Sequence, residues 1–164
     1  ARHNKNMTDV LYNNNIYGMT GGQYSPLTPE HSKAATAPYG TIERSFDIAE
    51  LVKAAGATFV ARATTFHAPM LADLIAQGIE HKGFSLIEAI TACPISFGRQ
   101  NKMGGPADMI KWQRDHALPL AAFEKLSEEQ KAGKFPIGVL YKAEGVKEYT
   151  EAYDELIAAA QGGK

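Results

Sequence analysis

The sequence has very little cysteine and no long apolar segment. Cys93 is the single cysteine among 164 residues, which excludes an internal disulfide and any metal site built from several cysteines of this chain. No apolar run approaches the ~20 residues that a membrane-spanning helix needs, and no signal-peptide pattern precedes the first motif. We therefore expect a cytoplasmic protein with no membrane partner.

An excess of charge is also missing. The chain has 17 basic and 18 acidic residues and a formal net charge of -1 at pH 7, so it lacks the positive field with which proteins attract nucleic acid. With 45% hydrophobic residues, it has the composition and length of about one globular domain with a real core. We expect no nucleic-acid partner.

Strand patterns alternate with helix patterns along the chain. Short β-rich runs predict strands at 9–12, 58–64, 84–91 and 136–141. Helical periodicity predicts helices at 47–56, 69–83, 107–116 and 149–160. A polar hinge is expected at 127–134. This alternation predicts an α/β fold with a mainly parallel sheet flanked by helices.

Capping signals and apolar spacing define the first two helices. Asp47 is expected to cap the first helix, Glu50 to complete a capping box, and Gly56 to end the helix. Gly83 is expected to cap the end of the second helix. The residues that we expect to face the core are Ile48, Leu51, Val52 and Ala55 in the first helix, and Leu71, Leu74, Ile75 and Ile79 in the second.

The segment VLYNNNIYGMTGGQYSPLTP, residues 10–29, has the most unusual composition. A strand that ends at Asn13 leads into a region without helical or strand period, 18–41, which we interpret as a long functional loop. Asparagine oxygens are hard neutral ligands that suit Mg²⁺, and glycines with free N–H groups let a backbone approach a diphosphate. The alternative is an ordinary turn, because asparagine tolerates left-handed conformations and caps its own backbone.

A second unusual group follows another predicted strand. Cys93 comes directly after the run at 84–91, and on residue type alone a lone cysteine there is a small buried hydrophobe. Ligands of parallel sheets bind at the carboxyl ends of the strands. We therefore expect Cys93 and the segment 13–22 to lie at the same edge of the sheet.

Four blocks of the sequence together resemble a known family. They are NNNIYGMTGGQYSPLTP (13–29), HKGF (81–84), ITACPISFGRQNK (90–102) and FPIGVLY (135–141). In the same order, these blocks are similar to the β subunit of 2-oxoacid:ferredoxin oxidoreductases, most closely to the branch that acts on 2-oxoglutarate. The blocks span most of the chain.

The resemblance implies a domain organisation and a set of site residues. Residues 1–126 would be the C-terminal part of a thiamine-diphosphate-binding domain, and residues 127–164 a hinge, a short strand and a C-terminal helix of the same subunit. Asn14, through its side-chain oxygen, and Ile16, through its backbone oxygen, would coordinate Mg²⁺. Cys93 would be one of four thiolates that hold a [4Fe–4S] cluster. The residues beside the diphosphate of the cofactor would be Met19, Thr20, Gly21 and Gly22.

The implied activity is the oxidative decarboxylation of a 2-oxoacid, with 2-oxoglutarate as the expected substrate, to acyl-CoA and carbon dioxide, with electrons passing through the cluster to ferredoxin. The chain lacks the family's GDG segment and its upstream cysteine pair, and a single cysteine does not hold a cluster unaided. We therefore expect this chain, which begins at Ala1, to be the C-terminal part of a longer β subunit. Its expected partners are the remaining N-terminal part, an α subunit and ferredoxin, with a 2-oxoacid and coenzyme A as substrates.

Two other functions stay open. A non-redox thiamine-diphosphate-dependent 2-oxoacid decarboxylase subunit would share the asparagine motif and would not need Cys93. A non-catalytic phosphate-binding or assembly module would keep only the fold.

Histidines and basic residues give weaker signals. His67 and His81 are candidate acid–base groups, although each lies at a helix end, where a histidine often interacts with the helix terminus. Arg99 and Lys102 are either ordinary solvated charges or a site for an anionic partner such as a substrate carboxylate or coenzyme A. The sequence assigns no catalytic acid or base.

Overall fold

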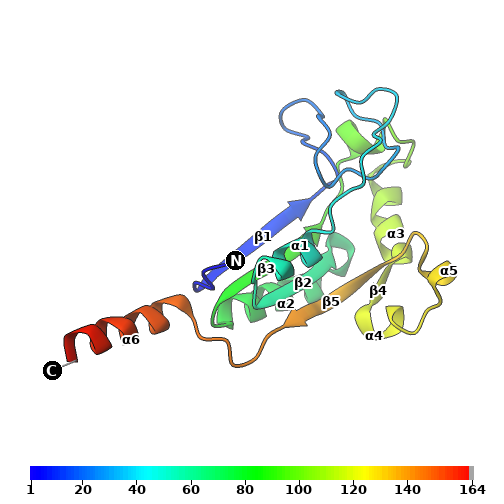
Figure 1. Cartoon of the computed structure of the whole chain (residues 1–164). Coiled ribbons are helices and arrows are strands. Elements are labelled where there is room, and N and C mark those ends of the chain that lie inside the picture. The colour runs from blue at the N-terminus through cyan, green and yellow to red at the C-terminus, as the bar shows by residue number, and fades with distance from the viewer. Residues whose placement is uncertain (163–164) are drawn as a thin grey trace.

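A five-stranded sheet forms the centre of the structure (Figure 1). The computed structural model describes residues 1–162. Its strands are β1 (Met7–Asn13), β2 (Phe59–Thr64), β3 (Phe84–Ile90), β4 (Ala117–Pro119) and β5 (Phe135–Lys142). Their order is β1-β3-β2-β5-β4; β1, β3 and β2 are parallel, β5 is antiparallel to β2, and β4 is parallel to β5. The predicted α/β fold with a mainly parallel sheet is confirmed.

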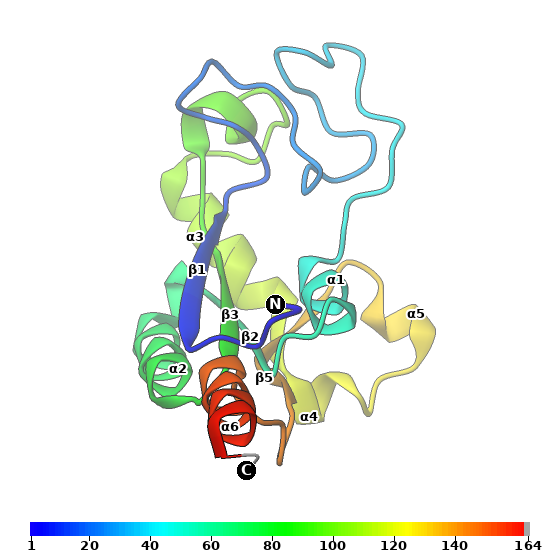
Figure 2. The same ribbon diagram turned by 60° about the vertical axis from the view of Figure 1, so that its left-hand side comes forward.

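Helices connect and flank these strands. They are α1 (Ile48–Ala54), the 3-10 turn η1 (Thr65–His67), α2 (Ala68–Glu80), the π-helix η2 (Pro94–Gly98), α3 (Pro106–His116), α4 (Leu120–Phe123), α5 (Glu128–Lys131) and α6 (Tyr149–Gly162). α6 extends from the end of the molecule opposite the long loops (Figures 1 and 2). Among residues 1–162, no helix has the length and apolar character needed to cross a membrane.

Each face of the sheet has its own apolar cluster, because α1 and α2 cover opposite faces (Figure 2). The buried residues on the α1 side are Ala49, Ala57, Val60, Phe84 and Leu86. Those on the α2 side are Phe59, Ala61, Ala63, Leu74 and Ile87. β2 is buried along its whole length, as expected for a strand with helices on both faces. The sheet therefore forms the rigid centre from which the loops extend.

The inward face of α2 differs from the predicted one at a single position. Leu74 is buried as expected, but the side chain of Ile79 is 68% exposed. Gly78 lies against the sheet instead, and a Cβ on this glycine would be 2.5 Å from Cδ1 of Ile87. Since the backbone of α2 approaches β3 at Gly78, the next residue is rotated about 100° away from the core. The prediction for Ile79 was wrong for this reason.

The start of α1 agrees with the sequence except at Glu50. Asp47 caps the helix and accepts hydrogen bonds from the N–H groups of Ala49 and Glu50. The predicted capping box was wrong, because the Glu50 carboxylate pairs with Lys53 at 3.3 Å. Leu51 and Ala55 were also expected in the core, yet both are exposed. Leu51 is 49% exposed and contributes to a surface cavity described below.

The segment between α3 and β5 has more structure than its sequence predicts. The short strand β4 and the helix α4 were not predicted. In the predicted hinge, α5 forms a short helix with a reciprocal capping box between Ser127 and Gln130. β4 extends the sheet only because β5 is its neighbour, a long-range condition that no local pattern encodes.

The residues before β1 are tied to the amino ends of β2 and β3. Oδ1 of the buried Asn4 accepts hydrogen bonds from Phe84 N at 3.0 Å and Thr58 Oγ1 at 2.8 Å. Gly83 has a φ of +125°, and a Cβ at this position would overlap Asn4 Oδ1. Gly83 was expected to cap α2, but α2 ends at Glu80. The glycine is instead required by the approach of Asn4.

A pH dependence of stability follows from His81, which belongs to the same polar cluster. Its Nε2 lies 2.7 Å from Thr58 Oγ1, and burial, with a smaller contribution from the nearby Lys142, lowers the pKa of His81 below its usual value. The unfolded chain therefore binds a proton at higher pH than the folded protein does. The contribution of His81 is fully present above about pH 6.5 and is lost as pH falls through its lowered folded-state pKa.

We expect the thermal unfolding midpoint of the purified protein to fall as pH decreases from 7.5 to 5, and to fall less in a His81→Gln variant, which cannot take up the proton. The measurement is the midpoint by circular dichroism at each pH. His31→Gln, at an exposed position, is the matched control and should keep the wild-type pH profile. An unchanged pH profile in His81→Gln would contradict the assignment.

Candidate functional site

The ends of β1 and β3 lie side by side at the carboxyl edge of the sheet. Asn13 pairs in register with Ile90, and Thr91 N donates a hydrogen bond to the Asn13 carbonyl at 2.8 Å. The loops that follow these strands gather beyond this edge (Figures 1 and 2). The predicted meeting of the segment 13–22 with Cys93 at one edge is therefore confirmed.

Three consecutive asparagines form a tight turn at the end of β1. Oδ1 of Asn13 accepts a hydrogen bond from Asn15 N at 3.1 Å, and Oδ1 of Asn14 accepts one from Ile16 N at 3.2 Å. Asn15 has a left-handed φ of +65°, and its carbonyl accepts a hydrogen bond from Thr28 Oγ1 at 2.6 Å. We call residues 13–16 the asparagine turn. The turn interpretation is confirmed, and it leaves a second lone pair on the Asn14 oxygen for another contact.

The glycine-rich loop that follows is closed by its own backbone. Tyr17 and Gln23 form an isolated antiparallel bridge, and the N–H groups of Gly21 and Gly22 donate to the carbonyls of Gly18 and Tyr17. The sequence analysis expected free N–H groups at these two glycines to bind a diphosphate. In the structure, both N–H groups form hydrogen bonds within the loop. Both glycines have positive φ values and serve the shape of the loop.

The predicted diphosphate contacts differ in exposure. Met19 is 99% exposed, and Thr20 donates its hydroxyl proton to Gln23 Oε1 at 2.6 Å. Gly22 is buried, and a Cβ there would lie 3.3 Å from Cβ of Ser96 in η2. Met19 and Thr20 therefore form the accessible tip of the loop, while Gly22 packs it against the segment that follows Cys93.

The thiol of Cys93 lies directly against the glycine loop. A Cβ on Gly18 would be 3.1 Å from Cys93 Sγ and 3.8 Å from Asn14 Nδ2. Cys93 is half-buried and not in a disulfide, and it precedes the π-helix η2, whose Phe97 and Gly98 N–H groups both donate to the Cys93 carbonyl. π-Helices are rare and occur often at functional sites. Gly18 thus separates the asparagine turn from a free thiol.

A small apolar cluster supports both parts of the site. Ile16, Ala34, Phe97 and Met109 are buried together, with Cys93 packed against them. The Ile16 side chain is only 4% exposed, whereas its carbonyl accepts a hydrogen bond from Gly18 N at 3.1 Å. This cluster connects the asparagine turn, η2 and α3 into one unit.

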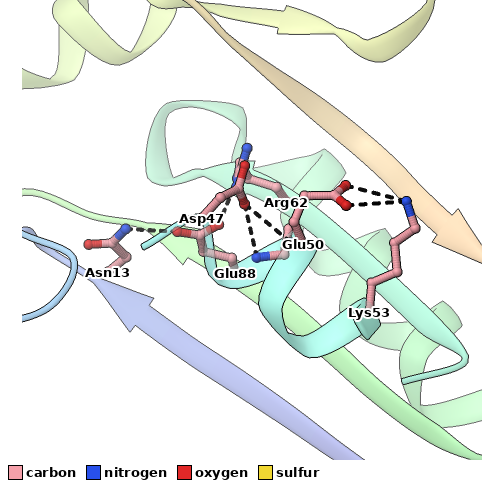
Figure 3. Close-up of polar contacts among 7 residues, drawn as sticks. Asn13, Asp47, Glu50, Lys53, Arg62 and Glu88 are labelled. Atoms are coloured by element: carbon pink, nitrogen blue, oxygen red, sulfur yellow. Dashed lines mark hydrogen bonds and ion pairs between the residues drawn. The ribbon is translucent and has the colours of Figure 1, made fainter. Parts of the chain in front are cut away.

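Behind the asparagine turn lies a charged cluster around the buried Arg62 and Glu88, which the sequence analysis missed (Figure 3). Arg62 Nε donates to Glu88 Oε2 at 2.6 Å, and Arg62 Nη2 donates to Asp47 Oδ1 at 3.0 Å. Asn13 Nδ2 donates to the other Glu88 oxygen, Oε1, at 2.7 Å. A signal was present in the sequence, since Arg62 and Glu88 are the only charged residues of two strands made mostly of apolar residues.

Two cavities border the asparagine turn. The larger, of about 380 Å³, has Asn13 to Tyr17 on one side and an apolar wall that includes Leu27, Phe46 and Leu51 on the other. The smaller, of about 270 Å³, includes Arg62 and Glu88 together with Trp112 and Phe135. The turn is thus accessible from the side of α1.

The two histidines occupy opposite edges of the sheet. His67 follows β2 at the carboxyl edge, where its Nδ1 lies 2.8 Å from Thr64 Oγ1, and burial lowers its pKa. His81 lies near the start of β3 beside Thr58, at the far end from Cys93. His81 therefore does not belong to this site. Arg99 and Lys102 are exposed on the segment after Cys93, which is compatible both with ordinary solvation and with contact to an anionic partner.

This chain provides some, but not all, of the ligands that Mg²⁺ and a [4Fe–4S] cluster require. Asn14 Oδ1 and the Ile16 carbonyl are two neutral oxygens of the kind that Mg²⁺ prefers, but Mg²⁺ takes six ligands. Cys93 offers one thiolate, whereas a [4Fe–4S] cluster usually takes four. Within residues 1–162, no group of three or more His, Cys, Asp or Glu side chains could hold a metal ion. Any metal centre here therefore needs ligands from outside this part of the chain.

Comparison with known families identifies the class of the protein. Residues 1–89 match the family described as thiamine pyrophosphate enzyme, C-terminal TPP binding domain. The chain therefore belongs to the thiamine pyrophosphate enzymes, and the asparagine turn lies inside the matched region.

Individual relatives narrow this class. The chain is 49% identical to 2-oxoglutarate synthase subunit KorB of Methanothermobacter thermautotrophicus over 138 residues, 84% of this chain and 48% of that protein. It is 46% identical to the Methanocaldococcus jannaschii protein of the same name over 157 residues, 96% of this chain and 58% of that protein. The chain thus spans about half the length of the curated relatives it matches.

A solved structure agrees with these relatives. The 2-oxoglutarate:ferredoxin oxidoreductase from Magnetococcus marinus, with 2-oxoglutarate, coenzyme A and succinyl-CoA bound, superimposes with a TM-score of 0.80 at 32% sequence identity. The match covers 100% of this chain and 56% of that one. The fold of this chain is therefore that of a segment of such an enzyme.

A Gly18→Ala substitution should disturb both parts of the site. The new methyl group would press on Cys93 Sγ at 3.1 Å, closer than side chains normally pack, and would contact the Asn14 amide. We expect increased solvent accessibility of the thiol, measured as at least about threefold faster modification by a thiol reagent, since reactivity follows exposure.

Gly162→Ala is the matched control, because a Cβ there has nothing within 4 Å. It should leave the modification rate unchanged. Equal rates in Gly18→Ala and the wild type would mean that the loop shifts freely and that the contact does not restrain Cys93.

Proposed function

We propose that this chain forms the C-terminal part of the β subunit of a 2-oxoacid:ferredoxin oxidoreductase. The assembled enzyme would convert 2-oxoglutarate and coenzyme A to succinyl-CoA and carbon dioxide, with two electrons passing singly to ferredoxin. The observation that carries the proposal is the position of Gly18, which lies between the asparagine turn and the Cys93 thiol and has no side chain to hold them further apart. A cofactor-binding turn with a free thiol beside it suits an enzyme that couples thiamine chemistry to electron transfer.

The chain's own residues would hold one end of the cofactor. Asn14 would offer its side-chain oxygen and Ile16 its carbonyl to Mg²⁺, since both oxygens belong to one rigid turn. Met19 and Thr20, at the exposed tip of the glycine loop, and Gly21 and Gly22, which shape it, would lie beside the diphosphate. When bound, thiamine diphosphate supplies the electron sink for loss of carbon dioxide.

Cys93 would contribute one thiolate to a [4Fe–4S] cluster. Its exposure is intermediate, and its carbonyl accepts hydrogen bonds from two N–H groups of η2. The remaining N-terminal part of the subunit would supply the other three cysteines and the carboxylate that Mg²⁺ requires. An α subunit, ferredoxin, the 2-oxoacid and coenzyme A would complete the system.

The division of the chain at residues 126 and 127 remains a prediction. β5 begins after this division and pairs with β2 and β4 of the earlier part, so the two parts share one sheet.

The test of the cluster assignment is Cys93→Ala in the assembled oxidoreductase. We expect loss of most of the [4Fe–4S] electron-spin-resonance signal and of ferredoxin reduction, because the cluster loses one of its ligands. Ser96→Ala, in the same π-helix, is the control and should keep the signal. An unchanged signal in Cys93→Ala would refute the role of Cys93 as a cluster ligand, and a wild-type complex without any such signal would favour a non-redox thiamine-diphosphate decarboxylase.

The test of the cofactor assignment is Asn14→Ala in the same complex. We expect the apparent dissociation constant for Mg²⁺ in the presence of thiamine diphosphate to rise at least about tenfold, as when other metal sites are perturbed. Asn101→Ala removes loop contacts to Lys33 at the same edge and should leave this constant unchanged. Failure of the wild-type complex to bind thiamine diphosphate at all would favour a non-catalytic module.

A further inference from the structure

We infer that Arg62 and Glu88 are positioning residues for the asparagine turn, acting through Asn13. The role at Mg²⁺ rests on the proposed function, whereas the effect on the turn itself does not. Both residues lie inside the sheet, and neither is a ligand in the proposal above. Their connection to the turn is a continuous set of hydrogen bonds (Figure 3).

The pair is almost completely removed from water. The side chains of Arg62 and Glu88 are 9% and 4% exposed, and the two residues face each other across β2 and β3. Burying two charges carries a large desolvation cost, and well-packed apolar residues of similar volume are often as stable. A gain in stability is therefore a poor explanation for the presence of this buried pair. The hydrogen bond from Asn13 to Glu88 indicates another role.

This hydrogen bond fixes the orientation of Asn13. An ionised carboxylate only accepts hydrogen bonds, so Glu88 Oε1 requires the NH₂ group of Asn13, which it meets at 2.7 Å. The Asn13 oxygen must then point the other way, and it accepts the N–H of Asn15 at 3.1 Å. Glu88 thus determines which side of the Asn13 amide faces the turn.

This orientation holds Asn15 in its unusual conformation. A left-handed φ of +65° is uncommon for a residue with a side chain, and here it is supported by Asn13 on one side and Thr28 on the other. Asn15 lies between Asn14 and Ile16 in the chain. The conformation of Asn15 therefore sets the relative position of Asn14 Oδ1, which accepts the N–H of Ile16, and of the Ile16 carbonyl.

The other end of the cluster is fixed to α1. Arg62 Nη2 donates to Asp47, the residue that caps α1. The guanidinium is therefore engaged by two carboxylates, Glu88 and Asp47. Residues of β1, β2 and β3 and the cap of α1 meet in this cluster. A substitution at Glu88 therefore affects the asparagine turn through a direct hydrogen bond to Asn13.

The experiment uses the assembled oxidoreductase with Glu88→Gln. Glutamine keeps the shape of the side chain but puts an NH₂ group at one of the two oxygen positions, so either Arg62 Nε or Asn13 Nδ2 loses its acceptor. We expect faster backbone hydrogen exchange in the segment 13–17, and an apparent Mg²⁺ dissociation constant about tenfold higher in the presence of thiamine diphosphate. The turnover rate at saturating Mg²⁺ and thiamine diphosphate should stay within about twofold of wild type, because the ligands themselves are intact.

Two further variants keep the inference falsifiable. Asn13→Ala removes the same link while leaving the ion pair intact, and it should reproduce both effects even if Glu88→Gln does not assemble. Ser85→Ala is the control, since Ser85 is buried in the same strand and donates to Gly78 O at 2.9 Å. It should alter neither the exchange of residues 13–17 nor the Mg²⁺ dependence.

The outcomes separate positioning from general stability and from the proposed function. Unchanged exchange at 13–17 in both Glu88→Gln and Asn13→Ala overturns the inference. So does a lower unfolding temperature with an unaltered Mg²⁺ dependence, which is the result of a merely structural role. A wild-type complex that binds neither Mg²⁺ nor thiamine diphosphate refutes the proposed function, and the exchange measurement alone then decides whether Glu88 orders the turn.

Discussion

The parallel pairing of β1 with β3 is the constraint on which the site depends. It places Asn13 level with Ile90, so that the two loops carrying the asparagine turn and Cys93 begin at adjacent positions. A slip of one residue would turn every side chain of β1 to the other face of the sheet. Asn13 would then lose Glu88, and the asparagine turn would leave from the wrong side.

Close backbone approaches determine how the other elements join this pair of strands. Gly78 brings α2 against Ile87, and Gly83 leaves room for Asn4 at the amino edge. Gly18 performs the equivalent task at the carboxyl edge, between Asn14 and Cys93. Each of these contacts requires a glycine, because a side chain at that position would collide with its neighbour. The packing at both ends of the sheet therefore depends on residues that have no side chain.

The sequence predicted the parts of the fold that have a local cause. Strand periodicity and the cap at Asp47 gave the sheet class and the position of α1. Errors arose where a distant partner decides the outcome: Ile79 is exposed because Gly78 meets Ile87, and β4 exists because β5 lies beside it. The asparagine turn was found through composition and resemblance. Its support by Glu88 depends on a pairing across 75 residues of sequence, which no local pattern reveals.

The side chain and the backbone carbonyl of Ile16 have different roles. Its side chain is enclosed in the small cluster with Phe97 and Met109, whereas its carbonyl belongs to the asparagine turn. A backbone oxygen is present whichever amino acid occupies the position, so natural variation among apolar residues at 16 is neutral for any ligand that this oxygen binds. Truncation of the Ile16 side chain would weaken packing in the small apolar cluster and would leave the backbone oxygen in place. A scan of side-chain substitutions therefore cannot detect a ligand role of the Ile16 carbonyl.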